Sequence, residues 1–171
     1  MLTLTLLRHA KSSWADPSLD DHDRPLAKRG VKAIPLVADF MRREGVKPDI
    51  VLCSDAMRTR ATLALLLADL GTPNPRVIYD ETLYLAAPHT ILSAVAESGQ
   101  RHVLVVGHNP GLHALALELV GDGNRKLLSA LAREFPTAAL AVLTFDVADW
   151  NDVKPLSGHL THFTTPRKLA D

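Results

Sequence analysis

Short apolar runs recur along the chain, and each ends at a small or polar residue. The first run, Leu2 to Leu7, stops at Arg8 and His9. The run from His102 to Val106 is nearly continuous in apolar residues, as expected for a strand buried on both faces of a parallel sheet. Similar runs predict further strands at Ile50–Cys53, Val77–Tyr79 and Ala138–Phe145, and a last extended segment at Gly158–Phe163 on the sheet edge.

Between these runs, apolar residues recur at helical spacing, as in the stretch from Ile34 to Met41. The predicted helices are Ala27–Glu44, Ala56–Leu70, His89–Glu97, Leu112–Leu119 and Lys126–Arg133. Pro35 predicts a kink or a late restart in the first of them, and Ser54 and Asp55 are expected to cap the second. Strands that alternate with helices predict an α/β fold, with a mostly parallel sheet covered by helices on both faces.

The composition is that of one soluble globular domain over residues 1–171, with 47% hydrophobic and 22% charged residues. Lys plus Arg and Asp plus Glu both number 19, which argues against nucleic acid as a partner, because that binding needs a basic surplus. No apolar run is long enough to cross a membrane, and the first residues lack a signal-peptide pattern. Cys53 is the single cysteine, which excludes an intrachain disulfide, and a cytoplasmic location is expected.

Three of the predicted strands end close to arginine or histidine side chains. The first ends in Arg8 and His9, the second at Ser54 with Arg58 one helical turn later, and the fourth just before His108. The carboxyl ends of parallel strands lie on one edge of a sheet, so these side chains are expected to converge in one crevice. Arginine matches the oxygens of a phosphoryl group, and histidine is suited to nucleophilic attack near neutral pH. The sequence therefore predicts a site for a phosphoryl group with a nucleophile in it.

The segments that carry these residues resemble the signature segments of the histidine phosphatase superfamily, which has the phosphoglycerate mutase-like fold. They read LLRHAK at 6–11, SDAMRTRAT at 54–62 and VGHNP at 106–110. The segments 23–30 and 158–166 resemble the small SixA-like phosphohistidine phosphatases within that superfamily. The matches extend over nearly the whole chain and come in the family order. The resemblance implies a three-layer αβα domain with a mostly parallel central sheet.

The resemblance also implies a mechanism. His9 would attack phosphorus and become a phosphohistidine, which water would then hydrolyse. Arg8, Arg58 and a protonated His108 would hold the phosphoryl oxygens and stabilise the charge that develops during transfer. Asn109 belongs to the same substrate-binding set. Because these groups neutralise the phosphate, neither a metal nor any other cofactor is required.

The proton donor is less clearly indicated. Many members of the superfamily place a carboxylate in the loop after the third strand, where Glu81 is the nearest candidate and Asp80 lies beside it. A phosphoimidazole that is protonated on its other nitrogen leaves as neutral imidazole, whereas a phosphate ester needs an acid to avoid leaving as an alkoxide. Because an acid is only weakly indicated, the sequence slightly favours a phosphoramidate over a phosphate ester as the substrate.

The short chain leaves little room for a segment that would cap the pocket. An open pocket admits a protein-borne phosphohistidine, with Lys11, Ser12 and Trp14 on its rim. The expected partner is a phosphorylated protein that carries phosphohistidine, such as a phosphotransfer domain. A small phosphorylated metabolite, acted on by a phosphomonoester phosphatase of the same fold, is the alternative.

Three other interpretations stay open at this point. A cysteine phosphatase would use Cys53 with Arg58, although only four residues separate the two instead of the five of that phosphate loop. A zinc site would use the eight histidines, which show no paired metal-ligand motif. A phosphate-binding regulatory module with little turnover is the third. The Asp-rich loop around Asp21 is expected to be a solvated loop.

Overall fold

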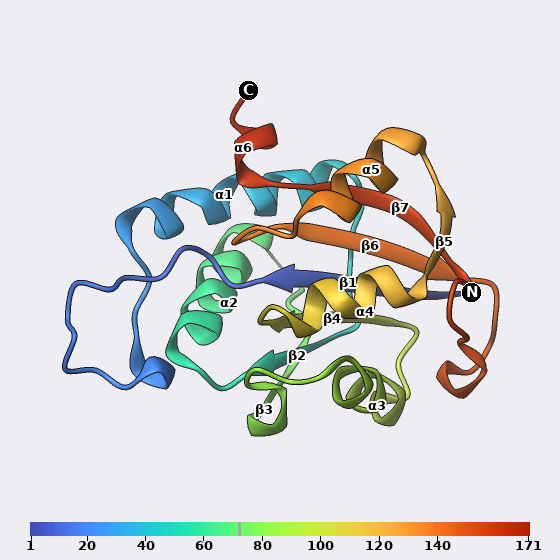
Figure 1. Ribbon diagram of the computed structural model, residues 1–171, viewed down its shortest axis with the longest axis horizontal. Helices are drawn as coiled ribbons and strands as arrows, with labels where there is room; N and C mark the ends of the chain where they lie inside the picture. The colour runs from blue at the N-terminus through green and yellow to red at the C-terminus, as the bar shows by residue number, and fades with distance from the viewer. Residues whose placement is uncertain (72) are drawn as a thin grey trace.

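A computed structural model describes residues 1–71 and 73–171, and its strands form one seven-stranded sheet in the order β3-β2-β4-β1-β6-β7-β5 (Figure 1). The strands are β1 (Leu2–Arg8), β2 (Ile50–Ser54), β3 (Arg76–Asp80), β4 (His102–Gly107), β5 (Val120–Gly123), β6 (Leu140–Phe145) and β7 (Gly158–Thr164). Strand β6 pairs antiparallel with β1 and β7, and all other neighbours pair in parallel. The predicted mostly parallel sheet is therefore confirmed.

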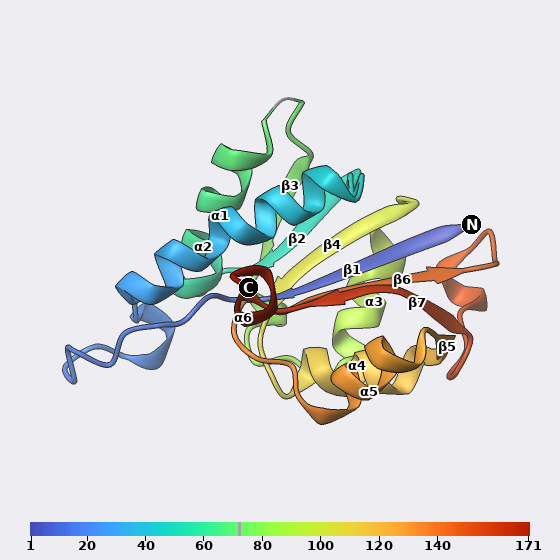
Figure 2. The ribbon, with the colours of Figure 1, turned by 90° about the horizontal axis from the view of Figure 1, so that it is seen from above.

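Helices cover both faces of the sheet. They are α1 (Lys28–Arg43), α2 (Met57–Leu70), α3 (Pro88–Ser98), α4 (Gly111–Leu119), α5 (Arg125–Arg133) and α6 (Pro166–Leu169), with the 3-10 turns η1 (Asp21–Asp23), η2 (Glu81–Leu83) and η3 (Trp150–Asp152). Figure 2 shows α1 and α2 on one side of the sheet and α3, α4 and α5 on the other, which confirms the three-layer arrangement. Within the described residues, no helix combines the length and the apolarity needed to span a membrane.

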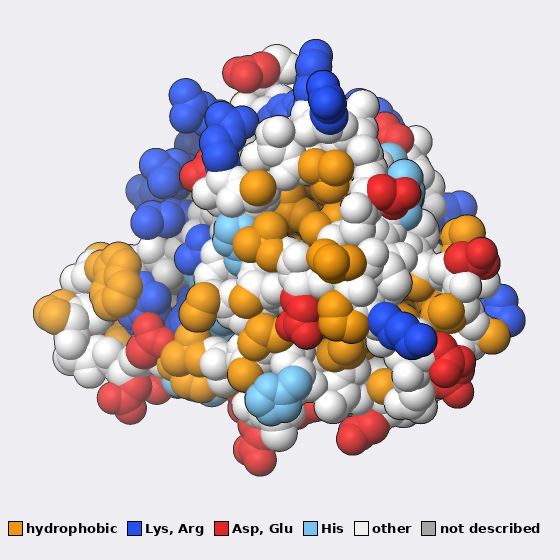
Figure 3. All heavy atoms as spheres, turned by 45° about the vertical axis from the view of Figure 1, so that its right-hand side comes forward, with side chains coloured by type: hydrophobic (Ala, Val, Ile, Leu, Met, Phe, Trp, Pro, Cys, Tyr) orange, Lys and Arg blue, Asp and Glu red, His pale blue; other side chains and the backbone are white. Residues whose placement is uncertain are grey.

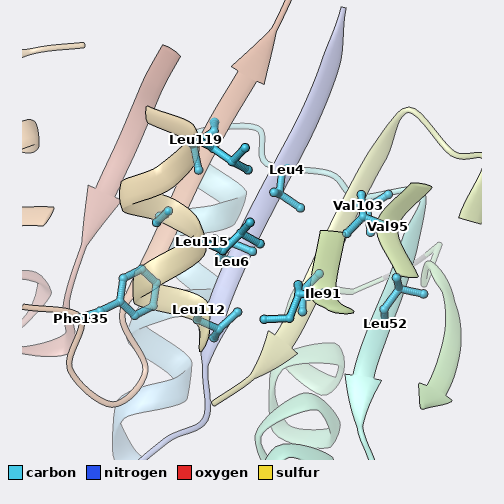
Figure 4. Packing of buried hydrophobic residues seen from close by; sticks show 14 of the residues in the cluster. Leu4, Leu6, Leu52, Ile91, Val95, Val103, Leu112, Leu115, Leu119 and Phe135 are labelled. Carbon is cyan, nitrogen blue, oxygen red and sulfur yellow. The ribbon is translucent and has the colours of Figure 1, made fainter. Parts of the chain in front are cut away.

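The core is divided in two by the sheet, because successive strand residues point to opposite faces. Leu4 and Leu6 of β1 pack under α3 and α4, where Figure 4 shows them with Ile91 and Leu115. Leu7 of the same strand packs on the other side, under α1 and α2. Each fully buried leucine contributes about 1.5–3 kcal/mol relative to an exposed one, so β1 ties both layers together.

Four predicted details differ from the structure. Helix α1 begins at Lys28 and continues through the exposed Pro35, so the late restart that this proline could have caused is absent. Helix α2 begins at Met57 with no side-chain cap, because Ser54 instead lies beside a histidine of the site. Strand β5 has the sequence VGDG, which carries no apolar pattern to predict it. Since β5 pairs outside β7, the last long strand is interior to the sheet, and the prediction that it forms the edge was wrong.

The connections after two neighbouring strands diverge at one edge of the sheet. Strands β1 and β4 are parallel neighbours, with Arg8 aligned to Gly107. The chain leaves β1 toward α1 on one face and leaves β4 toward α4 on the other (Figure 2). Ligands bind where connections diverge in this way. Gly30 lets α1 approach this edge closely, since a Cβ there would lie 2.2 Å from the carbonyl oxygen of Lys11.

Candidate active site

Two histidines meet where β1 and β4 end. His9 follows Arg8, His108 follows Gly107, and the alignment of these two strand ends brings the histidine ring centroids to 5.4 Å. The backbone N–H of His9 donates to the carbonyl oxygen of Gly107 at 3.1 Å, which extends the parallel ladder by one residue. Both side chains are buried. The predicted convergence of these two strand ends is therefore present in the structure.

The tautomer of His9 follows from its hydrogen bond. Its Nδ1 lies 2.8 Å from the carbonyl oxygen of Ala10, and a carbonyl only accepts, so Nδ1 carries the proton. Burial lowers the pKa of His9 from 6.5 to about 4, and the positive charges of Arg58 and Arg8 act in the same direction, while the bond to Ala10 opposes them. At neutral pH the ring is therefore uncharged, and the lone pair of Nε2 is free to act as a nucleophile.

Arg58 is held by a residue that the sequence placed in a solvated loop. Its two terminal nitrogens donate to Asp21, one to the carbonyl oxygen at 2.7 Å and one to the carboxylate at 3.0 Å. The hydroxyl of Tyr84 donates to the same carboxylate. This bond, followed by those from Arg58, lowers the pKa of Asp21 to about 2. The loop is solvent-exposed as expected, but η1 also brings Asp21 against the first turn of α2, a contact that the sequence did not indicate.

His108 lies between Ser54 and the ring of Tyr84. Its Nε2 is 2.7 Å from the hydroxyl oxygen of Ser54, and its ring meets that of Tyr84 edge-on at 5.3 Å between centroids. Burial, reinforced by the positive charge of Arg58, lowers the pKa of His108 from 6.5 to about 3. The sequence predicted a protonated His108, but in this environment the ring is neutral at pH 7, because a buried site beside guanidinium groups disfavours another positive charge.

Buried polar atoms without a partner are concentrated at this site. Among the described residues they number four: Nε of Arg8, Nε of Arg58, Nδ1 of His108 and Oδ1 of Asn109. The two guanidinium atoms can only donate. Buried donors are normally satisfied, so donors left free at a cluster with positive charge indicate a place for an anionic acceptor. Arg8 and Asn109 are held in place by Phe135, whose carbonyl oxygen accepts from Arg8 at 3.2 Å and from Asn109 at 2.8 Å.

Comparison with known proteins connects this geometry to a family. A sequence profile of the histidine phosphatase superfamily (branch 1) matches residues 4–84. The chain is 38% identical over 165 residues to Rv1276c of Mycobacterium tuberculosis, covering 94% of this chain and 100% of that protein. The SixA protein of Agrobacterium tumefaciens, assigned as a phosphohistidine phosphatase, superposes with a TM-score of 0.80 at 32% identity, covering 96% of this chain and 98% of that one. The SixA protein of Nakamurella multipartita, assigned likewise, gives 0.80 at 33% identity over 96% of both chains.

The chain belongs to the histidine phosphatase superfamily, in its SixA-like branch. Its fold also matches the protein histidine phosphatase SixA solved with tungstate, at a TM-score of 0.76 and 22% identity over 98% of this chain and 99% of that one. The family membership that the three signature segments predicted is thereby confirmed.

Not every residue that was predicted for the site enters the cluster. Lys11 is exposed, and its backbone carbonyl accepts from Ala27 at the start of α1. Ser12 is buried in a β-bridge with Leu26. Glu81 opens η2 as an exposed side chain, with no hydrogen bond or ion pair to any described residue. The carboxylate of Asp80, by contrast, accepts from the backbone and hydroxyl of Thr82, so it serves to cap η2.

The rival interpretations fit the structure less well. Cys53 is fully buried, and burial raises the pKa of its thiol to about 12, so it is no thiolate at neutral pH. Across residues 1–71 and 73–171, no three His, Cys, Asp or Glu side chains come together as a set of metal ligands.

Two site residues, Asp21 and Tyr84, were not identified as such from the sequence, and Ser54 was named at its strand end but expected to cap a helix. Ser54 stands before a helix, which favours the interpretation as a cap. Tyr84 lies beyond the predicted third strand and has no local pattern that marks it. Asp21 could have been suspected, because an arginine buried near one strand edge needs a counter-charge, and the Asp-rich loop follows the first strand directly.

Proposed function

We propose that this protein is a phosphatase that works through a phosphohistidine intermediate on His9 and that its substrate is a phosphohistidine on another protein. The observation that carries the proposal is a neutral buried histidine, with Nε2 unprotonated, beside two guanidinium groups that have free buried donors. This combination provides a nucleophile together with positive charge for a phosphoryl group. Membership of the histidine phosphatase superfamily supports it.

The reaction takes place in two displacements at phosphorus. In the first, Nε2 of His9 forms a bond to phosphorus while the phosphorus–nitrogen bond of the substrate breaks, and the substrate histidine leaves with its own proton as neutral imidazole. In the second, water attacks the phosphorus of phospho-His9, the bond to Nε2 breaks, and inorganic phosphate leaves. Throughout, Arg8 and Arg58 donate to the phosphoryl oxygens, and Nδ1 of His9 keeps its proton on the Ala10 carbonyl.

His108 would contribute as a further donor once a phosphoryl dianion is bound. Its pKa, about 3 without such a charge, rises when two negative charges arrive beside it, because an opposite charge favours the protonated ring. Asn109 and the Ser54 hydroxyl complete the polar wall of the site. Lys11 and Ser12 belong to the rim.

The choice of phosphohistidine as substrate rests on leaving-group chemistry. A neutral imidazole can leave without a general acid. Of the predicted pair of carboxylates, Glu81 is the one that forms no side-chain hydrogen bond with any residue that the structure describes, and it is exposed as the first residue of η2. We propose Glu81 as the proton donor for phosphate esters alone. The two SixA structures that match at more than 30% identity are assigned as phosphohistidine phosphatases, which supports the same choice.

The site has the positive groups it needs without a metal, so activity should survive EDTA. The protein is expected to act in the cytoplasm, where Cys53 would stay reduced.

The deciding experiment compares kcat/KM for a histidine-phosphorylated protein, a small phosphate ester and a sugar phosphate, and traps the intermediate by rapid alkaline quench, in which phosphohistidine persists. We expect phosphohistidine to be the best substrate and an acid-labile phosphoenzyme to form with the wild type. His9→Ala should abolish it, whereas His159→Ala, an exposed histidine paired with Asp122, should leave it unchanged. A sugar phosphate turned over much faster would refute the substrate, and a phosphoenzyme that persists in His9→Ala would refute the nucleophile. Binding without any phosphoenzyme would indicate a regulatory module.

A further inference from the structure

Two adjoining hollows lie beside the reactive cluster, over α1, α5 and α6. Their volumes are about 610 and 620 Å³. They share Glu134, Thr165 and Arg167 in their walls, so they are adjacent on the surface. Neither is lined by His9, Arg58 or His108. We call the two hollows together the basic groove.

The part of the groove over α5 and α6 is lined by five cations. They are Arg125, Lys126, Arg133, Arg167 and Lys168. All five side chains are exposed. These cations come from two helices that are distant in the sequence, so no run of basic residues in the sequence predicts the cluster.

The part of the groove over α1 adds three more cations. They are Lys11, Arg29 and Lys32, again all exposed. Lys11 stands two residues after His9, and its backbone carbonyl is packed against Gly30 of α1. The groove therefore begins next to the end of β1 and extends away from the site to the N-terminus of α5.

The charge of the groove is unbalanced, although the chain as a whole is neutral. Its walls hold eight cationic side chains and a single carboxylate, Glu134. None of the eight forms an ion pair with any residue in the described part of the chain. Figure 3 shows Lys and Arg side chains gathered along the upper part of the molecule, on the side of α6, while most Asp and Glu lie lower. Unpaired like charges repel one another, so this surface is complementary to a surface rich in carboxylates.

One segment belongs to both the groove and the reactive cluster. Glu134, Pro136 and Thr137 face the groove, while the carbonyl oxygen of Phe135 between them accepts hydrogen bonds from Arg8 and Asn109. A partner seated in the groove therefore lies against the wall that positions the phosphoryl-binding groups. The groove does not include the reactive histidines, but it adjoins the site through this segment and through Lys11. It therefore suits a protein partner that presents its phosphohistidine at the end of β1.

We propose that the basic groove docks an acidic surface of the phosphorylated protein substrate and so delivers its phosphohistidine to His9. This inference rests on the proposed function. It goes further by assigning the charge of the substrate protein and the surface that recognises it. Because the groove cations are exposed, the attraction acts mainly on encounter and KM, and salt screens it.

The test uses three probes on the full chain: an acidic phosphotransfer domain phosphorylated on histidine, a basic histone phosphorylated on histidine, and N-phosphoimidazole. The wild type should prefer the acidic protein over the histone in kcat/KM by about tenfold or more at low salt, and added salt should close the gap. The variant Arg125→Glu/Lys126→Glu/Arg133→Glu should raise KM for the acidic protein by about tenfold or more and leave turnover of N-phosphoimidazole unchanged. Arg125→Lys/Arg133→Lys should behave as wild type.

The matched control is Lys47→Glu/Arg76→Glu/Arg101→Glu, which changes the net charge equally through three exposed cations outside the groove. An equal rise of KM in this control would refute docking in the groove, as would a loss of N-phosphoimidazole turnover in the groove variant. A wild type that hydrolyses the acidic protein and the histone equally, with no effect of the groove variant, would also overturn the docking surface while leaving the phosphatase intact. A wild type that hydrolyses no phosphohistidine protein would instead overturn the proposed function.

Discussion

The protonation of His9 offers the sharpest quantitative test of the reactive cluster. Burial beside two guanidinium groups lowers the pKa of His9 from 6.5 to about 4. With a pKa of 6.5, about one tenth of the rings would be neutral at about pH 5.5, whereas with a pKa near 4 nearly all of them are. The difference corresponds to about 3 kcal/mol against protonation of the buried ring. Formation of the phosphoenzyme should therefore change less than about twofold between about pH 7.5 and 5.5, provided that the substrate's ionisation is corrected for.

The direct assay is an NMR titration of the histidine ring protons, with the His9 signal assigned by its loss in His9→Gln. His22 serves as an internal control, because its hydrogen bond to Asp55 raises its pKa and moves its titration in the opposite direction. Rapid-quench measurements of phosphoenzyme formation then provide the kinetic counterpart. A His9 midpoint near 6.5, with a tenfold slower step at about pH 5.5, would refute the reasoning that burial keeps the nucleophile neutral.

The same protonation affects stability, with a definite sign. The unfolded chain takes up a proton on His9 near pH 6.5, whereas the folded chain does so only near 4, so the unfolded state binds more protons between these values. The free energy of unfolding should therefore be highest above about pH 6.5 and fall as the pH is lowered through about 4. His108, with a pKa of about 3, acts in the same direction. In His9→Gln, the free energy of unfolding measured with urea should fall less between about pH 6.5 and 4. An unchanged pH dependence would contradict the assignment.

Four further substitutions test individual contacts. Asp21→Asn keeps the backbone bond to the buried guanidinium but removes its counter-charge, and steady-state kcat/KM should fall by about tenfold to a hundredfold through misplacement; an unchanged value would exclude a positioning role. Glu81→Gln should slow an ester substrate by about a hundredfold and leave phosphohistidine turnover intact, and equal losses on both substrates would contradict the leaving-group reasoning. Cys53→Ser should retain activity because the thiol is buried and protonated, whereas total loss would restore a cysteine nucleophile. Gly30→Ala should lower the free energy of unfolding by about 3 kcal/mol, since its Cβ would overlap the Lys11 carbonyl, and a smaller change would mean that α1 shifts to make room.

The local pattern of the chain predicted most of the fold. Buried strands such as β1 and β4 are marked by apolar runs, and the helices by their spacing, because burial on a fixed face imposes these periods on the sequence. Strand β5 was missed, since its four residues carry no such pattern and it forms through pairing with β7. Pro35 did not delay the start of α1 either, because packing of the whole helix outweighs the loss of one backbone hydrogen bond at the proline.

The candidate site divides in the same way. Arg8, His9, Arg58 and His108 could be named from the sequence, because parallel strands place their ends together whatever lies between them. Their roles in catalysis remain predictions that the experiments above address. Asp21, by contrast, reaches the site through the turn η1, and nothing in its neighbours along the chain shows that it does so.

The sequence by itself determined which residues form strands and helices, and which chemical groups stand at the strand ends, because both depend on order along the chain. Only the tertiary structure decided the protonation of the histidines and the counter-charge of Arg58, because these depend on burial and on distances to groups far away in sequence. It also decided the gathering of eight scattered cations into one groove on a chain whose total charge is zero. Composition counts charges, but the electrostatic field that a substrate meets depends on where folding places them.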